Sequence, residues 1–394
     1  MKIGDKMKKI IIVSNDILPN KLLPAGSSGL RAVGLGVGLS EYGYDVHYVA
    51  PLHLIKDFEK KYFNGSKIKY PANVTYMNFM NLPSWLSARN PDAVIMSNAN
   101  HGEAIMPYLE DESSRQTFFV YDLFAPKLLE MTYGGFSESE IDEMYRRKKK
   151  LLQKADLIIV NGEKKLTYLA GNVLENEKYK FVHGKPTKVV NFSIPILLKN
   201  HVLSSNDISQ IKFFKGGYNQ FWNEEVEINN KIQKMILAHP NAELHRIEAK
   251  HWGGKQSLQD IKNVAVKNGG EYLYGLQDLN SYVNILKKMS ISLDVFYRTK
   301  EREYAMVTRT VVSLCAGTPV IHPAFTELGK YISEYKAGET YSDPKEIPSI
   351  IEKIFDNPEL ISTYRNNTSK LVEEVFNPKT AILPLVEELR KRDI

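Results

Sequence analysis

Short apolar runs alternate with stretches of helical periodicity along most of the chain. The first series predicts strands at 10–13, 46–49, 74–79, 93–96, 118–121 and 157–160, and a second series predicts strands at 211–214, 243–247, 272–274, 291–296 and 320–321. Helical segments lie between most of these strands. In the segment 224–238, for example, the apolar residues are spaced so that they lie on one face of a helix. This alternation is typical of βαβ units with a mostly parallel sheet.

Two successive series predict an α/β protein with two doubly wound, Rossmann-like domains facing across a cleft. A chain of 394 residues exceeds what one hydrophobic core usually supports. We expect a first domain at 1–200, a second domain at 201–377 and a C-terminal helix at 378–394, for which packing against the first domain is one option. Ligands are expected at the carboxyl ends of the parallel strands, where loops and helix starts converge.

Composition indicates an ordinary soluble protein, with 43% hydrophobic and 25% charged residues. The single cysteine, Cys315, lies among apolar helical residues, which predicts a buried, inert thiol and fits a reducing cytoplasm. The first apolar run is too short for a signal peptide or a membrane span.

Five positively charged residues follow one another directly at positions 146–150. The run predicts either a solvated helix face or a peripheral contact with anionic lipid at the inner face of the membrane. Nucleic acid is disfavoured as a partner because no aromatic platform accompanies the run. The residues are Arg146, Arg147, Lys148, Lys149 and Lys150.

A Gly/Ser-rich loop follows the first predicted strand and runs into a helix, in the segment "PAGSSGLRAVGLGVGL". Glycine lets backbone amides approach a phosphate, and a helix start adds partial positive charge. Gly29 and Arg31 are therefore candidate ligand contacts. Three further glycines, Gly34, Gly36 and Gly38, fall inside the helix, where close packing on the sheet is the expected compensation for their poor helix propensity.

Two candidate sites fall in the second series. After its first strand, "KGGY" could place a cation, free amides and an aromatic face beside a diphosphate, although a tight turn with buried aromatics explains it equally well. Further on, "TRT" precedes an apolar helix that Gly317 ends, so its amides could hold a phosphate or its threonines could simply cap the helix. These residues are Lys215, Gly216, Gly217, Tyr218, Thr308, Arg309 and Thr310.

Two further polar residues follow strands of the first series. His101 and Asp122 each come at the end of a strand where the ligand is expected, with capping of the next turn as the alternative role of Asp122. The sequence has no D-x-D, no phosphate-binding P-loop and no H-E-x-x-H helix, so no metal or cofactor is expected.

Taken together, these segments resemble the family 4 glycosyltransferases, which are retaining enzymes of the GT-B architecture. The resemblance is carried by "SSGLRAVGLGVGL", "VYDLFAPKLLE", "ADLIIVNGEKKLTYLAG", "KGGYNQFW" and, most specifically, "REYAMVTRTVVSLCAGTPVI". It implies that the nucleotide-sugar donor binds mainly to the second domain. The donor-binding candidates are then Gly29, Arg31, Lys215, Gly216, Gly217, Tyr218, Arg298, Thr308, Arg309 and Thr310.

The pattern departs from the family at its paired glutamates, which touch the donor sugar and the ribose. Val312 stands at the second glutamate position, and Tyr304 at the first, with Glu303 one residue earlier as a partial substitute. The resemblance implies a hexosyltransferase of polysaccharide or glycolipid synthesis in which Glu303, Asp122 and His101 are the catalytic candidates. The departure keeps open an inactive GT-B scaffold or partner subunit. A sugar-nucleotide epimerase would need an acid and base cluster that the sequence does not show.

Overall fold

The computed structural model describes residues 7–20, 24–62, 65–112, 116–171, 177–181, 183–194, 210–216, 226–247, 266–275 and 277–394. The chain divides into two compact units, and each is described by itself. Unit 1 comprises Met1–Pro19, Ala25–Pro195 and Asn377–Ile394, whereas unit 2 comprises Asn20–Pro24 and Ile196–Phe376.

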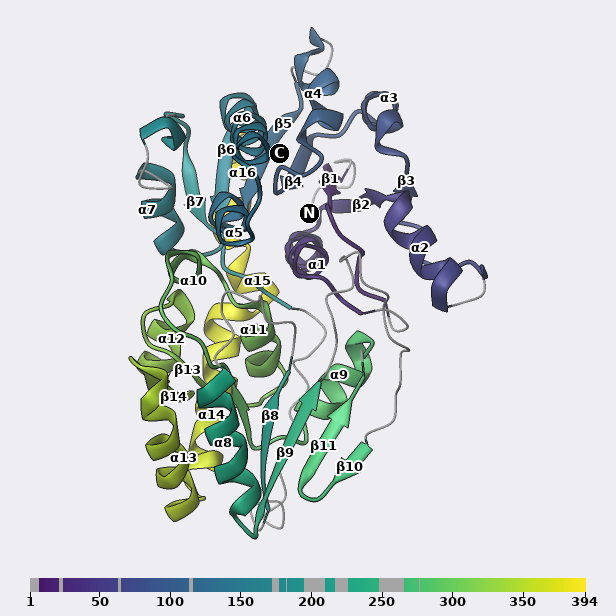
Figure 1. Cartoon of the computed structure of the whole chain (residues 1–394). Helices are drawn as coiled ribbons and strands as arrows, with labels where there is room; N and C mark the ends of the chain where they lie inside the picture. The colour runs from purple at the N-terminus through teal and green to yellow at the C-terminus, as the bar shows by residue number, and fades with distance from the viewer. Residues whose placement is uncertain are drawn as a thin grey trace. The chain divides into compact units, whose positions relative to one another are not determined.

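Unit 1 is built on a seven-stranded parallel sheet in the order β3-β2-β1-β4-β5-β6-β7 (Figure 1). Its strands are β1 (Lys9–Val13), β2 (Asp45–Pro51), β3 (Val74–Met77), β4 (Ala93–Ser97), β5 (Phe118–Leu123), β6 (Leu157–Val160) and β7 (Thr187–Val189). Its helices are α1 (Ser27–Glu41), α2 (Leu52–Tyr62), η1 (Phe79–Asn81), α3 (Leu82–Arg89), α4 (Gly102–Glu110), α5 (Lys127–Tyr133), α6 (Glu138–Lys154), α7 (Lys164–Ala170), η3 (Glu177–Tyr179), α15 (Pro378–Ala381) and α16 (Leu383–Arg390). The strand order reverses direction between β1 and β4, which is where ligands collect in such sheets.

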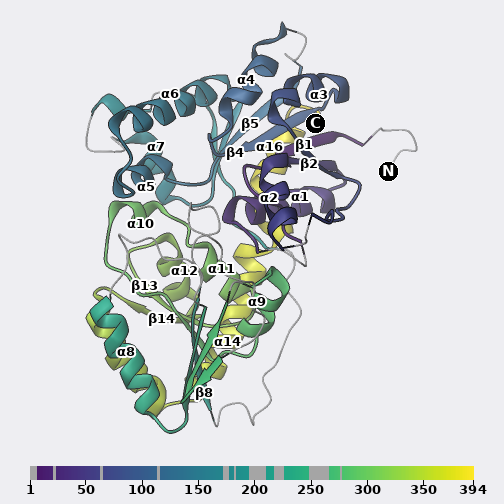
Figure 2. The same cartoon turned by 45° about the vertical axis from the view of Figure 1, so that its right-hand side comes forward.

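The C-terminal segment belongs to the core of unit 1. Leu385, Val386 and Leu389 of α16 are fully buried and share one apolar cluster with Leu35 and Leu39 of α1 and with the sheet. Figure 2 shows α15 and α16, in yellow, beside the rest of this unit. The last helix of the chain thus stabilises a sheet whose strands come from residues far earlier in the sequence.

The glycines inside α1 are explained by close packing, as the sequence predicts. A Cβ at Gly34 would lie 2.1 Å from the carbonyl oxygen of Ser193, and one at Gly36 would lie 2.1 Å from the hydroxyl of Tyr48. A Cβ at Gly38 would lie 2.5 Å from the carbonyl oxygen of Pro378, at the start of α15. These contacts leave no room for any side chain, so they offset the poor helix propensity of glycine.

Unit 2 holds a second seven-stranded sheet in the order β10-β11-β9-β8-β12-β13-β14, in which only the β10–β11 pair is antiparallel. Its strands are β8 (Ile211–Lys215), β9 (Ala242–Ile247), β10 (Val266–Asn268), β11 (Glu271–Tyr274), β12 (Ile291–Leu293), β13 (Val320–Pro323) and β14 (Gly338–Tyr341). Its helices are α8 (Val226–Ala238), α9 (Leu279–Leu286), α10 (Lys300–Tyr304), α11 (Thr308–Cys315), α12 (Glu327–Tyr335), η6 (Pro344–Glu346), α13 (Ile347–Asp356), α14 (Leu360–Leu371) and the π-helical turn η7 (Val372–Phe376).

The predicted α/β class with two doubly wound sheets is confirmed. All eleven strands expected from the sequence are present, although the structure ends two of them early, at Met77 and at Leu293. Three strands are additional, namely β7, β10 and β14, and each lies at an edge of its sheet. Cys315 is 3% exposed and burial raises its pKa to about 12, so the prediction of an inert thiol is also confirmed.

Candidate functional site

The carboxyl edge of the unit 1 sheet carries a row of polar residues. Asn15 and Asp16 follow β1, Asn98 follows β4, Asp122 lies near the end of β5, and Asn161 follows β6. Because β1 and β4 are neighbours at the point where the strand order reverses, Asn15 and the residues after β4 are brought together. The Asn15 side-chain amide donates a hydrogen bond to the carbonyl of Ser97 at this point.

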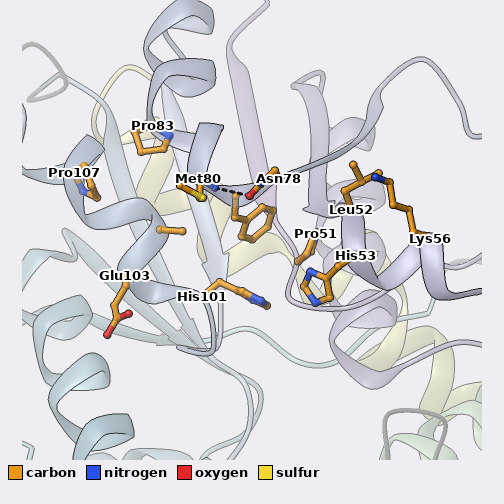
Figure 3. Close-up of a pocket in the computed structure, with 12 residues that line it drawn as sticks. Pro51, Leu52, His53, Lys56, Asn78, Met80, Pro83, His101, Glu103 and Pro107 are labelled. Atoms are coloured by element: carbon orange, nitrogen blue, oxygen red, sulfur yellow. Dashed lines mark hydrogen bonds between the residues drawn. The ribbon is translucent and has the colours of Figure 1, made fainter.

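A pocket of about 650 Å³ opens beside this point, within unit 1 (Figure 3). Its walls come from the end of β2 and the start of α2, from the turn η1 after β3, and from the first half of α4. His101, one of the residues predicted from the sequence, lines it together with His53. The two imidazole rings are 5.9 Å apart between centroids, and Phe79 meets His101 edge-on at 5.1 Å.

The hydrogen bonds around His101 fix which ring nitrogen carries the proton. Since the Asn15 amide nitrogen donates to Ser97, its Oδ1 is the atom that lies 2.7 Å from His101 Nδ1 and accepts a hydrogen bond from it. His101 is therefore protonated on Nδ1. Its Nε2 therefore keeps a lone pair, which makes it a hydrogen-bond acceptor.

The charge state of His101 follows from its surroundings. Burial, with further contributions from the nearby His53 and Arg147, lowers its pKa to about 4. The imidazole is thus neutral at physiological pH, and it is too weak a base to remove a proton from an alcohol by itself. Its chemistry is that of a fixed hydrogen-bond acceptor, which can orient a hydroxyl group.

The Gly/Ser loop packs on the connection that leaves β1. A Cβ at Gly29 would lie 1.9 Å from the carbonyl oxygen of Ile17, and one at Gly26 would lie 1.7 Å from the Asp16 carboxylate. Glycine at both positions is therefore required by packing, which accounts for Gly29 without a ligand. The helix start itself has no side-chain cap, because Gly26 occupies the N-cap position.

Asp16, which lies against this helix start, is a site residue that the sequence analysis missed. Its Oδ1 accepts a hydrogen bond of 2.8 Å from the amide of Ile17, but burial outweighs this and raises its pKa to about 7. The carboxyl group is therefore partly protonated at neutral pH. This lowers the negative charge beside the α1 start, where the sequence analysis places an anion.

Replacing Asp16 by asparagine is expected to stabilise the protein at pH 8 and to change little at pH 4.5. A carboxyl whose pKa is higher in the folded state holds its proton there, so stability falls as the pH rises from about 4 to about 7. Each pKa unit corresponds to about 1.4 kcal/mol, and partial exposure reduces the sum to about 2 kcal/mol at pH 8. Urea denaturation at both pH values measures the effect, with Asp57→Asn in α2 as the matched control. An equal effect at both pH values would contradict the assignment.

Arg31 and Asp122, two predicted site residues, are paired in the interior of unit 1. Asp122 accepts two hydrogen bonds of 3.1 Å from the guanidinium, and the side chains are 1% and 0% exposed. Asp122 also accepts a hydrogen bond of 2.7 Å from Ser97, while Arg31 donates to the carbonyl of Asn191 at 2.7 Å. Neither group is presented for ligand contact, because each is engaged by the other. We therefore infer that Arg31 and Asp122 position α1 against β5 and do not contact a ligand directly.

The predicted face of five cations on α6 is wrong for two of its members. Lys148 is fully buried on the same side as Ile141, Met144 and Leu151, and burial lowers its pKa to about 8. Arg147 turns to Glu143 and Glu103. Only three cations remain exposed on this helix segment, namely Arg146, Lys149 and Lys150.

A second buried lysine lies nearby. Lys165, in the first turn of α7, is 1% exposed and donates a hydrogen bond of 2.8 Å to Asn161 Oδ1, at the end of β6. Burial lowers its pKa to about 7. Uncharged and charged forms of Lys165 therefore coexist near neutral pH. In the sequence, Lys165 follows another lysine in a pattern typical of a helix surface, so its burial was not predicted.

In unit 2, Asp294 organises the carboxyl edge of the sheet. It follows β12 directly and is 5% exposed. Its carboxylate accepts hydrogen bonds from Arg309 and Thr310, at the start of α11, and lies 3.0 Å from His322 Nδ1, in β13. Burial opposes its ionisation, but Arg309, His322 and Thr310 outweigh burial and hold its pKa well below the usual value. Asp294 is thus a fixed anion that anchors the helix start.

The same hydrogen-bond chain reaches the next helix. His322 Nε2 lies 2.8 Å from Thr326 Oγ1, which caps α12 by accepting a hydrogen bond of 2.9 Å from the amide of Gly329. Burial lowers the pKa of His322, so its ring is neutral. The starts of α11 and α12 are therefore held in register through Asp294. Thr308 and the first-turn amides of α11 receive no side-chain cap from Val307.

The remaining donor-side candidates fall in three places. Lys215 and Gly216 end and follow β8, next to β12 in the sheet, and both are described. Gly217 and Tyr218 lie outside the described residues. Arg298 and Glu303 form an ion pair at the start of α10, in which Arg298 is 69% exposed and Glu303 19%. Val312 is 3% exposed within α11, so this position is apolar and enclosed.

Metal binding receives no support from geometry. Within the described ranges, no group of three or more His, Cys, Asp or Glu side chains is placed to hold an ion. Among those same residues, every helix is too short or too polar to span a lipid bilayer.

The residues that the sequence analysis missed share one signal. Asn15, Asp16, Asn161 and Asp294 each follow a strand within three residues, at the edge where ligands collect. A search for polar residues just after the predicted strands would have found the first three, but not Asp294, because the predicted strand runs to residue 296 and the strand in the structure ends at Leu293. The partners that they bind could not have been found in this way, because they lie far away in the sequence.

Comparison with known proteins supports the architecture. No protein-family model and no curated protein sequence matches the chain. Among solved structures, sucrose-phosphate synthase from Thermosynechococcus elongatus matches with a TM-score of 0.66 at 14% identity, covering 98% of this chain and 98% of that chain. HepE from Anabaena in complex with UDP-glucose matches with a TM-score of 0.63 at 13% identity, covering 97% and 99%. WaaG, a glycosyltransferase involved in lipopolysaccharide biosynthesis, matches with a TM-score of 0.58 at 9% identity, covering 94% and 97%. The chain therefore has the GT-B fold.

Proposed function

We propose that this chain is a glycosyltransferase that moves a sugar from a nucleoside diphosphate sugar to an acceptor hydroxyl, with retention of anomeric configuration. In this proposal, unit 2 binds the donor and unit 1 binds the acceptor. The observation that carries the proposal is the α11 start, an uncapped helix N-terminus held in place by a buried Asp294. The match of nearly the whole chain to structures such as HepE with UDP-glucose supports it.

On the donor side, the diphosphate binds to the first turn of α11 and to Lys215. Backbone amides at a helix start, together with a cation, favour an anionic group. Since Asp294 offsets the charge of Arg309, the task of Arg309 and Thr310 is to fix the helix start. Glu303, with Arg298 as its counter-ion, binds the donor sugar. Gly216, directly after β8, lets the backbone approach the diphosphate closely.

The transfer itself needs no protein nucleophile. The bond between the sugar anomeric carbon and the phosphate oxygen breaks, and the acceptor oxygen bonds to the same face of that carbon. The acceptor proton passes to the departing phosphate oxygen, whose charge the α11 amides and Lys215 stabilise. Positioning of the two substrates is the main contribution of the protein.

On the acceptor side, His101 orients the hydroxyl group. Its Nε2 lone pair faces the pocket and accepts a hydrogen bond from the acceptor, while Asn15 holds the ring from the other side. Asp122 acts at a distance, because its pair with Arg31 ties α1 to β5 and to the Asn191 segment.

Replacing His101 by phenylalanine is expected to lower kcat/KM for transfer by about tenfold, which is the loss of one hydrogen bond of about 1.4 kcal/mol. Because the pKa of His101 is about 4, its contribution should be constant from pH 5.5 to 8. Initial rates of transfer over that range measure both effects. His239→Phe, in unit 2, is the matched control. A rate that rises with a pKa near 6.5, and that loses this dependence in the variant, would contradict the acceptor role.

The experiment that tests the proposed function is release of nucleoside diphosphate from a panel of UDP-, GDP- and ADP-sugars by the purified chain. The proposal predicts slow hydrolysis of at least one donor without acceptor, and faster release with an acceptor. Absence of release and of binding for every donor would refute it.

A second candidate function is an inactive GT-B scaffold or partner subunit, which one observation favours. Val312 offers no carboxylate to a ribose, and Glu303 is already engaged by Arg298. Loss of a charged hydrogen bond to ribose would weaken donor binding by about 1.5–3 kcal/mol. Nucleotide binding without turnover would favour this alternative.

The proposal includes contact with anionic lipid, but with three cations instead of the five predicted from the sequence. The three exposed cations of the run at 146–150 would contribute about 1 kcal/mol each, so they supply a weak, reversible association. A cytoplasmic location and a role in polysaccharide or glycolipid synthesis follow the same proposal.

A further inference from the structure

The pocket beside His101 is lined mostly by apolar side chains. Figure 3 shows His53 and His101 on one side of it and Met80 and Pro83 on the other. Leu52 and Phe79 add to the apolar wall. A site that encloses a bare sugar needs a hydrogen-bond partner for each sugar hydroxyl that loses water, whereas seven of the twelve lining residues here are apolar.

Met80 is the clearest part of this wall. Its side chain is 85% exposed at the pocket, although methionine is usually buried. The backbone beneath it is fixed, because Asn78 Oδ1 accepts a hydrogen bond of 3.1 Å from its amide and begins the turn η1. A flexible thioether on a rigid turn suits packing against an apolar ligand of variable shape.

The one acid of the pocket does not oppose an apolar occupant. Glu103 forms an ion pair of 3.4 Å with Arg147 of α6, and its carboxylate points away from the imidazoles in Figure 3. The remaining polar groups of the lining are His53, Lys56, Asn78 and His101, whereas the apolar character lies at Met80, Pro83 and Leu52.

We propose that the pocket binds an amphiphilic acceptor, which carries a hydroxyl-bearing headgroup directly attached to an alkyl or aryl group. The headgroup lies at the two imidazoles, and the apolar group lies on Met80 and Pro83. A volume of about 650 Å³ falls in the ordinary range of small-molecule sites, roughly 300–1,000 Å³, and leaves room for both parts. Naming this molecule as the acceptor rests on the proposed function, whereas its binding to the pocket does not.

Calorimetric titration of the full chain tests the proposal without any donor. The probes are octyl β-glucoside below its micellar concentration, 4-nitrophenyl β-glucoside and methyl β-glucoside. At least one of the first two is expected to bind tenfold or more tightly than the methyl compound, and the better of the two identifies the apolar group as alkyl or aryl. Equal affinity for all three would overturn the proposal.

Two variants distinguish the pocket from general hydrophobic adsorption. Met80→Ser is expected to remove most of the advantage of the better amphiphile, by about tenfold in affinity, and to leave methyl β-glucoside unchanged. Met7→Ser removes another exposed methionine, 60% exposed before β1, and should change nothing. An advantage that survives Met80→Ser, or that disappears equally in Met7→Ser, would overturn the proposal.

The outcome can be separated from that of the proposed function. Amphiphile binding that depends on Met80, combined with no turnover of any nucleotide sugar, would refute the transferase and keep the pocket. Turnover with amphiphilic and methyl acceptors at equal kcat/KM would keep the transferase and refute the preference.

Discussion

Replacing Asp122 by alanine is expected to lower the free energy of unfolding by about 3–5 kcal/mol, because removal of one partner leaves a buried charge without compensation. Arg31 is 1% exposed and would keep only its hydrogen bond to the Asn191 carbonyl. Ser97 would lose its acceptor as well. Urea denaturation followed by circular dichroism measures the change.

The matched control for this pair is Glu143→Ala. Glu143 pairs with Arg147 on the surface of the same unit and is 53% exposed, so its removal should change stability by less than about 1 kcal/mol. Similar losses for Asp122→Ala and Glu143→Ala would show that the Arg31–Asp122 pair does not fix the fold of unit 1.

Replacing Asp294 by alanine is expected to have the second large effect, a loss of about 3–5 kcal/mol in unit 2 together with loss of nucleotide binding. Arg309 and Thr310 would lose the anion that fixes the start of α11, and His322 Nδ1 would lose its partner while Nε2 keeps Thr326. Calorimetric titration with the best nucleotide, below the unfolding temperature of the variant, separates lost binding from lost folding. Glu352→Ala, an exposed acid of α13, is the control.

The pH dependence of this cluster provides a second check. A carboxyl whose pKa is lowered in the folded state contributes stability that is fully present above its usual pKa, near 4, and is lost as the pH falls below that value. The wild-type protein should therefore lose more stability between pH 5 and pH 3 than Asp294→Ala does. Parallel losses would indicate that Asp294 is not held ionised by its neighbours.

The central strands of both sheets could be predicted from the sequence, whereas three of the edge strands could not. Strands such as β1, "KIIIV", are buried on both faces and appear as unbroken apolar runs. The missed strands β7, "TKV", and β14, "GETY", are short and half-buried, because a strand at the edge of a sheet packs on fewer neighbours. No apolar run marks them.

For the site, the sequence indicates which residues are polar at strand ends but not which of them meet. Arg31 and Asp122 are 91 positions apart, and only the sheet order brings them into contact. Lys148 is different, because it falls on the stripe formed by Ile141, Met144 and Leu151, so its burial could have been predicted from helical periodicity. The tautomer of His101 depends on a hydrogen-bond chain through Asn15, which no sequence pattern reports.

The most direct test of the account is calorimetric titration of the purified chain with UDP, GDP and ADP and with their glucose or mannose conjugates. The account predicts that one nucleoside diphosphate binds at unit 2 with a dissociation constant below about 1 mM, that is, with about −4 kcal/mol or better, and that Asp294→Ala abolishes this binding. Heat of binding that is absent for all of these compounds, or that Asp294→Ala leaves unchanged, would contradict it.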